Sequence, residues 1–348
     1  MNAETVIVAG DVGGTNTTIA LMAPEGNSFR IVRKQRYSSQ QLSGIEEAIS
    51  DSLEGFRRDH PDLKLTACCF SAAGPVRDNR CKLTNVPWSV DGAVISELFG
   101  APAFVINDFS AVCYGLPLLQ LDNPEEVTVL QHPDGSIPEP HGDVMAAAGA
   151  GTGLGVGFLI RNGDHVRAFP TEAGHVDLAP VDDTMSDFYR FLRAELNGQR
   201  PGAELSISGM GISNLYRFFR SKLDGPVDDQ LARIDDAAVT ERPPLISRGA
   251  ADGHPLLQQV MRYFVQMYAN FASNAALNYI PSAGLFLAGG IAAKNQQFFL
   301  EDDLFMRTFL ENYNPNIRTV IERIPVYIIR NYDVSLYGAA NAARMLKE

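Results

Sequence analysis

The segment Thr5–Met22, TVIVAGDVGGTNTTIALM, constrains the fold more than any other stretch of this 348-residue chain. Two runs of β-forming residues flank a glycine-rich turn, so the segment predicts a β-hairpin. Gly13 and Gly14 permit positive φ angles and put no Cβ between the backbone N–H groups and a ligand. The turn is therefore suited to holding an anion on its backbone N–H groups.

Asp11 precedes the glycines of this turn and would repel a phosphate unless a cation lay between them. A hydrated Mg²⁺ held by Asp11, with the backbone and the Thr15 hydroxyl holding oxygens, resolves that conflict. The alternative is a plain glycine-rich hairpin in which Asp11 is an ordinary turn residue. Both interpretations fit this segment taken alone.

A second glycine-rich turn, GAGTGLGVG from Gly149, follows a predicted strand over residues 144–148. It lacks the GxxxxGK[ST] pattern of a P-loop. It also fails GxGxxG, because position 154 is leucine and a strand rather than a helix follows. Like the first turn it carries a threonine, Thr152. Two such turns facing each other would clamp a polyphosphate.

Predicted strands and helices alternate along the chain, which defines an α/β fold. One predicted strand, 103–106, ends at Asn107 and Asp108, just before a predicted helix. Polar residues at the carboxyl end of a sheet strand lie where α/β proteins carry their sites. Asp108 has either a role at such a site or only that of a helix cap.

Glu172 and His175 are three residues apart in an otherwise apolar neighbourhood. No third ligand and no HExxH pattern accompanies them, which disfavours a metal site. Hydrogen bonds to hydroxyl groups of a ligand suit both side chains better. The alternative is a structural pair between the two.

The net charge of −12 argues against a nucleic acid or an anionic membrane surface as the main partner. The chain opens with no signal-like segment and contains no run of about 18 apolar residues. Its four cysteines include no CxxC pair, so we expect buried thiols and a cytoplasmic protein.

Six motifs occur in one order along nearly the whole chain: DVGGTN, IND, GAGTGLG, EAGHVD, a glutamate shortly before SGxG, and LAGG. Together they resemble the bacterial glucokinase family, part of the superfamily of sugar kinases, actin and heat-shock-chaperone ATPases. The resemblance implies a two-domain actin-like ATPase (ribonuclease H-like) fold with a cleft between a small and a large domain. The small α/β domain would comprise residues 1–110 with the C-terminal helix 332–348, and the large one residues 111–331.

The resemblance also implies an activity, the ATP-dependent phosphorylation of the 6-hydroxyl of glucose with Mg²⁺. Asp108 would be the catalytic base, and Asp11 would hold Mg²⁺ through water. The expected sugar ligands are Asn107, Glu172, His175 and Glu204. The expected ATP-binding residues are Gly10, Asp11, Val12, Gly13, Gly14, Thr15, Gly151, Thr152, Gly153, Gly289 and Gly290.

The sequence departs from the family pattern at three places, none of which affects the proposed chemistry. The first of them, at Met210, leaves the residues that contact adenine undetermined. The three departures are Met210 for the frequent proline of SGPG, Thr171-Glu172-Ala173 for Gly-Glu-Gly, and Ala292-Ala293-Lys294 for Val-Pro-Arg.

Other readings of the chain remain open. The same chemistry on mannose, an amino sugar or allose is the first alternative, and an idle sugar sensor the second. The presence of both Asp11 and Asp108 argues against the sensor. A chaperone-type ATPase lacks support, because no separate peptide-binding domain follows. The expected partners are the hexose and ATP, with neither nucleic acid nor membrane, and we expect a homodimer.

Overall fold

The computed structural model describes residues 5–83, 85–224 and 227–347. The ends of the expected domain ranges, residues 1–4 and 348, lie outside them. The contacts cluster into two compact units. The first comprises the chain up to Glu126, Gly157–Pro170 and the chain from Asn331 onward, and the second comprises Val127–Val156 and Thr171–Arg330. Residues 111–126 and 157–170 thus group with the first unit, outside the range 1–110 expected for it.

The first unit is built on a five-stranded sheet of order β3-β2-β1-β4-β8. β1 pairs antiparallel with β2 and parallel with β4, and β8 continues the sheet in parallel with β4. The strands are β1 Thr5–Val12, β2 Asn16–Glu25, β3 Ser28–Ser38, β4 Lys64–Ala72 and β8 Ala103–Asn107. A small second sheet in this unit consists of β5 Val76–Arg77, β6 Arg80–Lys82 and β7 Ser89–Asp91.

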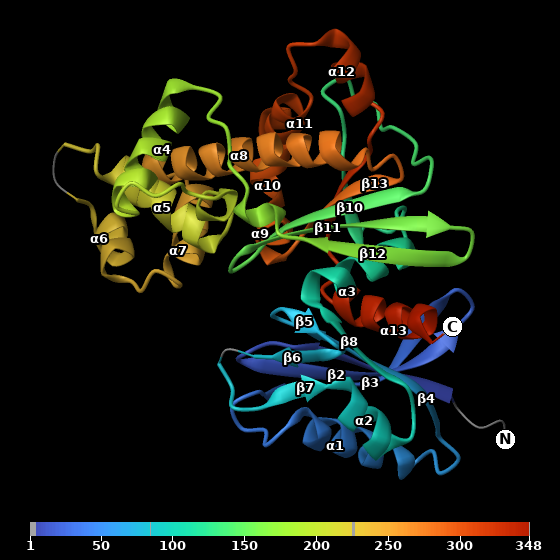
Figure 1. Ribbon diagram of the computed structural model, residues 1–348. Coiled ribbons are helices and arrows are strands. Elements are labelled where there is room, and N and C mark those ends of the chain that lie inside the picture. The colour runs from blue at the N-terminus through green and yellow to red at the C-terminus, as the bar shows by residue number, and fades with distance from the viewer. Residues whose placement is uncertain (1–4, 84, 225–226, 348) are drawn as a thin grey trace. The chain divides into compact units, whose positions relative to one another are not determined.

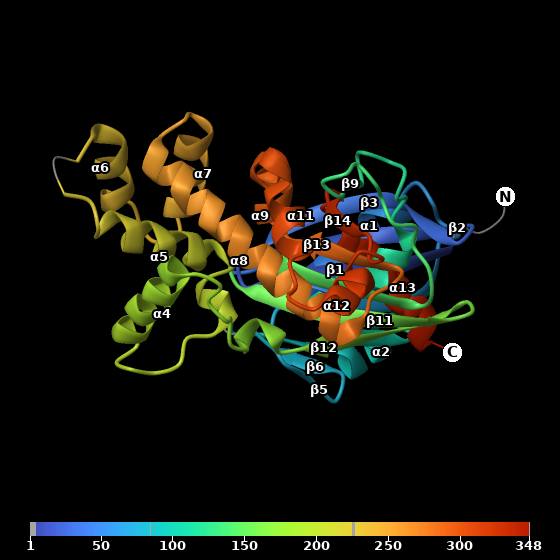
Figure 2. The ribbon, with the colours of Figure 1, turned by 90° about the horizontal axis from the view of Figure 1, so that it is seen from above.

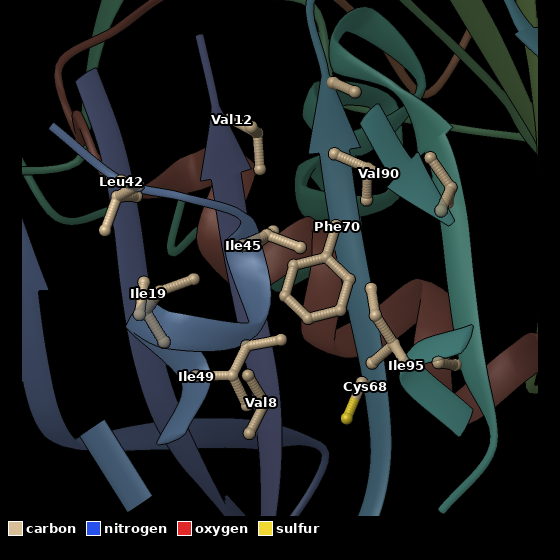
Figure 3. Close-up of a cluster of buried hydrophobic side chains, with 14 of the residues drawn as sticks. Val8, Val12, Ile19, Leu42, Ile45, Ile49, Cys68, Phe70, Val90 and Ile95 are labelled. Atoms are coloured by element: carbon tan, nitrogen blue, oxygen red, sulfur yellow. The ribbon is translucent and has the colours of Figure 1, made fainter. Parts of the chain in front are cut away.

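Helices cover both faces of the five-stranded sheet (Figure 1). α1 and α2 lie on one face, and α3 and α13 lie on the other. Side chains alternate between the faces of a strand, so Val8 and Val12 of β1 pack with Ile45 and Ile49 of α1, around Phe70 (Figure 3). The helices are α1 Ile45–Arg57, α2 Gly92–Phe99, α3 Asp108–Gly115, η1 Leu116–Leu118 and α13 Val334–Leu346.

Helix α13 packs closely on α3, which explains why the chain beyond residue 110 stays in the first unit. A Cβ on Gly338 would collide with the carbonyl oxygen of Ala111, so only glycine permits this approach. The Asn341 side chain donates to the carbonyl oxygen of Tyr114, with 2.8 Å between Nδ2 and O. These contacts fix the helix whose first residue is Asp108.

The second sheet has the order β12-β11-β10-β13-β14-β9. β10, β13 and β14 are parallel neighbours, while β9 runs antiparallel at the edge. The outer part of the β11–β12 hairpin is the segment counted with the first unit. The strands are β9 Val127–Leu130, β10 Val144–Ala150, β11 Leu154–Asn162, β12 His165–Thr171, β13 Gly284–Ala288 and β14 Val326–Ile329.

The second unit is otherwise mostly helical and is organised around α8 (Figure 2). α5, α7 and α11 pack against this long helix. Asp302 and Asp303 have positive φ angles, and residues 296–309 therefore form separate short helices rather than one continuous helix. The helices are η2 Ala173–His175, α4 Asp183–Glu195, η3 Ala203–Leu205, α5 Gly209–Arg220, α6 Asp229–Asp236, α7 Arg242–Ala251, α8 Pro255–Tyr279, α9 Gly290–Lys294, α10 Gln296–Leu300, η4 Glu301–Asp303, α11 Leu304–Phe309 and α12 Pro315–Ile321.

The four cysteines are buried and carry free thiols, as the sequence predicted. Burial raises the pKa of the Cys68 thiol to about 12. Within the described ranges, no helix has both the length and the apolar character needed to cross a membrane.

Candidate active site

The carboxyl ends of three parallel strands bring the first group of predicted residues together in the first unit. On the neighbouring strands β1 and β4, Asp11 lies beside Ser71. On β4 and β8, Ala72 lies beside Asn107. Asp11, Ser71 and Asn107 therefore lie along one edge of the sheet, the usual location of ligand sites in α/β proteins.

The first glycine loop joins β1 to β2 and leaves two backbone donors unpaired. The Gly13 N–H closes the turn by donating to the Asn16 carbonyl oxygen at 2.9 Å. Among the described residues, the N–H groups of Gly14 and Thr15 have no hydrogen-bond partner. Val12 contributes its side chain to the core, so only its backbone is available to a ligand. Adjacent free N–H groups of this kind suit an anion.

Ser39, which the sequence analysis missed, braces this loop from the residue after β3. Its N–H donates to the Thr15 carbonyl oxygen at 2.9 Å. Its hydroxyl donates to the Gly13 carbonyl oxygen at 2.7 Å. Because Ser39 is completely buried, these two bonds hold the loop backbone in one conformation, with the loop carbonyls turned toward the protein.

One of the two reasons expected for the glycines of this loop, a positive φ angle, does not apply. Neither Gly13 nor Gly14 has a positive φ angle. A Cβ on Gly14 would instead lie 3.0 Å from Cβ of Asn85. A Cβ on Gly10 would collide with the Phe70 ring. The neighbouring side chains, rather than a left-handed backbone, therefore exclude a larger residue at Gly10 and crowd one at Gly14.

Asp11 is partly buried and is surrounded by hydroxyl groups rather than by paired cations. The Ser71 hydroxyl lies 3.2 Å from Oδ1, and the Ser335 hydroxyl lies 3.3 Å from Oδ2. Desolvation raises the pKa of Asp11, and the two hydroxyl hydrogen bonds offset only part of that rise. Ser71 could have been found by the strand-end argument that selected Asn107, but no local signal points to Ser335.

Asn107, and not Asp108, is the cap of helix α3. The Asn107 Oδ1 accepts from the backbone N–H groups of Phe109 at 2.9 Å and Ser110 at 3.2 Å. The capping alternative for Asp108 is therefore wrong, because Asp108 is already the first residue of the helix. With its Oδ1 engaged by the cap and one amide N–H directed to Asp108, Asn107 has its second amide N–H available to a ligand.

The Asp108 side chain is exposed in the structure, yet protein atoms surround enough of its carboxylate to affect its ionisation. Desolvation raises the pKa of Asp108, and the charge of Asp11 raises it further. Hydrogen bonds from the Phe109 N–H and the Asn107 side chain act in the opposite direction. Solvent access leaves the carboxylate reachable, and the raised pKa increases its affinity for a proton.

The second glycine loop, between β10 and β11, repeats the construction of the first. The Gly151 N–H closes the turn by donating to the Gly153 carbonyl oxygen at 2.8 Å. In the part of the chain that the structure describes, the N–H groups of Thr152 and Gly153 have no partner. The Gly209 N–H, at the start of α5, donates to the Gly151 carbonyl oxygen at 2.9 Å. Again the carbonyls face the protein and two adjacent N–H groups remain free.

Glu204 lies against this second loop. Its Oε2 accepts from the Leu154 N–H at 2.9 Å, so one carboxylate oxygen is already bound to the loop backbone. Gly174 allows η2 to approach Leu154, because a Cβ on residue 174 would collide with the Leu154 carbonyl oxygen. The Ala203 N–H donates to the Val176 carbonyl oxygen at 2.8 Å and joins η3 to the end of η2. The fold thus gathers the second loop, Glu204 and the η2 segment in the second unit.

Glu172 and His175 lie next to each other on this η2 segment, with strongly exposed side chains. The exposed side-chain fractions are 92% for Glu172 and 65% for His175, and 3.9 Å separates Oε2 from Nε2. That separation exceeds hydrogen-bond length but is within ion-pair distance, so the pair is a long and strongly exposed one. Both polar groups remain available to a ligand, and their surroundings are open rather than apolar as expected.

Gly289 and Gly290 follow β13, whose last residue, Ala288, pairs with Gly149 of β10. Gly289 has φ 86°, and a Cβ there would collide with the Ala150 carbonyl oxygen. A Cβ on Gly290 would have only the end of the Lys294 side chain within 4 Å. Gly289 is therefore needed for packing beside the second loop, and Gly290 leaves open space there.

The protein supplies few ligands for a metal. Among the described residues, no group of three or more His, Cys, Asp or Glu side chains is arranged to hold an ion. Mg²⁺ typically keeps several waters and binds through one or two carboxylates plus phosphates of the substrate. Asp11 fits that mode, since a cation would neutralise a desolvated carboxylate whose hydrogen-bond partners are two hydroxyls.

Solved structures define the fold class. The chain superposes on a glucokinase from an Antarctic psychrotroph with TM-score 0.81 and 24% identity, covering 99% of each chain. It matches a ROK-family glucokinase from Streptomyces griseus, solved with glucose and AMPPNP, with TM-score 0.63 and 19% identity over 97% of this chain and 99% of that chain. The fold is that of the actin-like ATPases.

Sequence comparison identifies the family within this class. A curated glucokinase of Nostoc punctiforme is 32% identical over 354 residues, covering 98% of this chain and 100% of that relative. The sequence model of the family named Glucokinase matches residues 8–346. The chain belongs to the glucokinase family.

Proposed function

We propose that the protein transfers the γ-phosphoryl group of ATP to the 6-hydroxyl of glucose, forming glucose 6-phosphate and ADP. The observation that carries the proposal is that the family match spans residues 8–346 and so includes every residue of the candidate site. The Streptomyces griseus relative was solved with glucose and an ATP analogue, which supports the same pair of substrates.

In the proposed reaction Asp108 is the general base. The 6-hydroxyl is a weak nucleophile, and Asp108 accepts its proton as the oxygen attacks the γ-phosphorus. The new bond joins O6 to phosphorus, and the bond from phosphorus to the bridging oxygen of ADP breaks. Two features support this role. Asn107, and not Asp108, caps α3, so the Asp108 carboxylate is not needed as a cap. Desolvation also raises the pKa of Asp108.

The two glycine loops are the proposed phosphate-binding elements. Their four free N–H groups, on Gly14, Thr15, Thr152 and Gly153, would hold phosphate oxygens. Gly10 and Gly289 would contribute indirectly, because the absence of a Cβ lets Phe70 pack next to the first loop and Ala150 next to the second. Mg²⁺ held by Asp11 through water would neutralise charge on the transferred phosphoryl group. Preorganised donors and in-line placement supply most of the acceleration in such reactions.

The proposed sugar ligands are Asn107, Glu172, His175 and Glu204. Asn107 would donate from its amide, and Glu204 would accept with the carboxylate oxygen not bound to Leu154. Glu172 and His175 offer exposed polar groups on one short segment. A sugar hydroxyl left unpaired in a dry site costs ~1–3 kcal/mol, so several short polar side chains suit a polyol.

A coupled assay of sugar-phosphate formation, crossing four sugars with three phosphate donors, tests the proposal, and ADP release measures the hydrolysis of ATP alone. We expect the highest kcat/KM for glucose with ATP, ahead of mannose, glucosamine and allose. ADP and polyphosphate should be poorer donors, and ATP without sugar should turn over slowly. A higher kcat/KM for another hexose would make that hexose the substrate in place of glucose. No turnover with any sugar would favour a catalytically idle sugar sensor.

We further propose a cytoplasmic homodimer. Four buried free thiols support the reducing compartment. Light scattering coupled to size exclusion tests the dimer, because a monomer would have the chain mass of 37.9 kDa.

A further inference from the structure

One row of side chains crosses three strands of the first unit on the face that α13 covers. Asp11 of β1 pairs with Thr18 of β2, and Thr18 pairs with Arg36 of β3. Directly paired residues on adjacent strands share a face of the sheet. Two strand spacings, about 10 Å, separate the backbones of Asp11 and Arg36. A carboxylate, a hydroxyl and a guanidinium therefore follow one another in a line.

This row lines a cavity of about 300 Å³ that lies within the first unit. Lys34 from β3, and Asp333 and Ser335 from the start of α13, complete its polar lining. The cavity is open to solvent at Arg36, whose side chain is exposed. Asp11, the proposed magnesium ligand, is thus in the same cavity as two cations.

Only one of the two cations is free. Lys34 forms an ion pair with Asp333, with 2.7 Å between Nζ and Oδ2. In the described part of the chain, the side chain of Arg36 takes part in no hydrogen bond and no ion pair. Once Lys34 and Asp333 cancel, the charges remaining in the cavity are the Asp11 carboxylate and the Arg36 guanidinium.

We infer that Arg36 is a further phosphate-binding residue, which holds non-bridging oxygens of the donor's polyphosphate while Asp11 faces the metal. The inference rests on the proposed function for the identity of the donor. A metal-bound polyphosphate carries a cation and several anionic oxygens. In the row, the Asp11 carboxylate suits the cation and the Arg36 guanidinium suits the anionic oxygens. Guanidinium groups bind phosphate through two parallel N–H donors. Thr18, between the two, adds a hydroxyl.

Direct binding measurements test this assignment, using ATP, inorganic triphosphate and adenosine with wild-type protein and three variants. Arg36→Gln should weaken ATP and triphosphate binding about tenfold, as expected for a lost hydrogen bond to a charged group. Adenosine binding and the glucose KM should not change. Arg36→Lys should recover part of the loss, and added salt should shrink the difference between wild type and Arg36→Gln.

Arg30→Gln is the matched control, because it removes the same charge from the same strand at an exposed position near Glu25. It should bind ATP like the wild type. Equal ATP affinity in Arg36→Gln and wild type, or an equal loss for adenosine, would overturn the assignment. If the wild type phosphorylates glucose but Arg36→Gln binds ATP normally, only this inference fails. If ATP binding depends on Arg36 but glucose is not phosphorylated, only the proposed function fails.

Discussion

The carboxylate of Glu204 accepts a hydrogen bond from the backbone N–H of Leu154, with 2.9 Å between Oε2 and N. Leu154 is the first residue after the second glycine loop, so this bond fixes one end of the loop. A residue expected to bind sugar therefore also supports a proposed phosphate-binding element.

Glu204→Ala should accordingly raise the KM for ATP as well as the KM for glucose. Removing the acceptor leaves the Leu154 N–H unsatisfied, which costs ~1–3 kcal/mol and frees the loop. Glu172→Gln and His175→Ala are the comparison variants, and they should raise the glucose KM about tenfold with little change for ATP. Steady-state kinetics in both substrates check this, and an effect of Glu204→Ala on glucose alone would contradict it.

Gly151→Ala should weaken ATP binding without a change in stability. No atom lies within 4 Å of the added Cβ, so the fold tolerates it. In the proposed complex that Cβ would intrude on a phosphate, and we expect a loss of about tenfold in affinity. Gly14→Val is a weaker probe, because its Cβ would also press on Asn85. Calorimetric titration with ATP, beside thermal melting, tests the expectation; unchanged affinity would remove the second loop from the phosphate site.

Asn107→Ala should destabilise the protein more than Asp108→Ala does. Asn107 caps two N–H groups of α3, and loss of such a cap costs ~1 kcal/mol. After Asp108→Ala the Phe109 N–H keeps Asn107 as its partner, so the change in unfolding free energy should be small. Urea unfolding of both variants distinguishes the two, and equal destabilisation would contradict the division of roles.

Asp11→Asn should stabilise the free protein at neutral pH. Desolvation raises the folded-state pKa of Asp11, so the folded state binds its proton more tightly than the unfolded state does. The wild type therefore loses stability as pH rises from the unfolded pKa, about 4, through the raised folded value. The asparagine variant lacks this loss; its amide oxygen accepts from one of the two serine hydroxyls, and its NH₂ donates to the other.

Melting temperatures of both proteins across this pH range check the sign of the effect. The advantage of Asp11→Asn should grow as pH rises and should shrink when Mg²⁺ and ATP are added, because the cation neutralises the wild-type carboxylate. A variant that melts below the wild type at neutral pH would refute the desolvation account.

The sequence alone allowed us to predict the features that depend on residues close together in the chain. Both glycine turns, Asp11 and the Asn107–Asp108 strand end were found from residue type and spacing alone. Ser39 and Ser335 were not, because their contacts with the first loop and with Asp11 join residues 26 and 324 positions apart. Such pairings follow from sheet register and helix docking, which no local pattern encodes.

The wrong predictions have physical causes of the same kind. A positive φ angle was one reason expected for Gly14, but the angle is not positive and a Cβ there would instead crowd Asn85, which is distant in sequence. Asp108 was considered as a cap, yet its neighbour Asn107 takes that role.

The turnover of Asp108→Asn tests the central claim most directly. Asparagine preserves the volume and hydrogen bonding of the side chain but cannot accept the proton of the 6-hydroxyl. The account predicts that kcat for glucose phosphorylation falls roughly 10²–10⁴-fold, with modest changes in both KM values and an unchanged melting temperature. A folded Asp108→Asn protein that retains a third of the wild-type kcat would contradict it, because the base would then lie elsewhere.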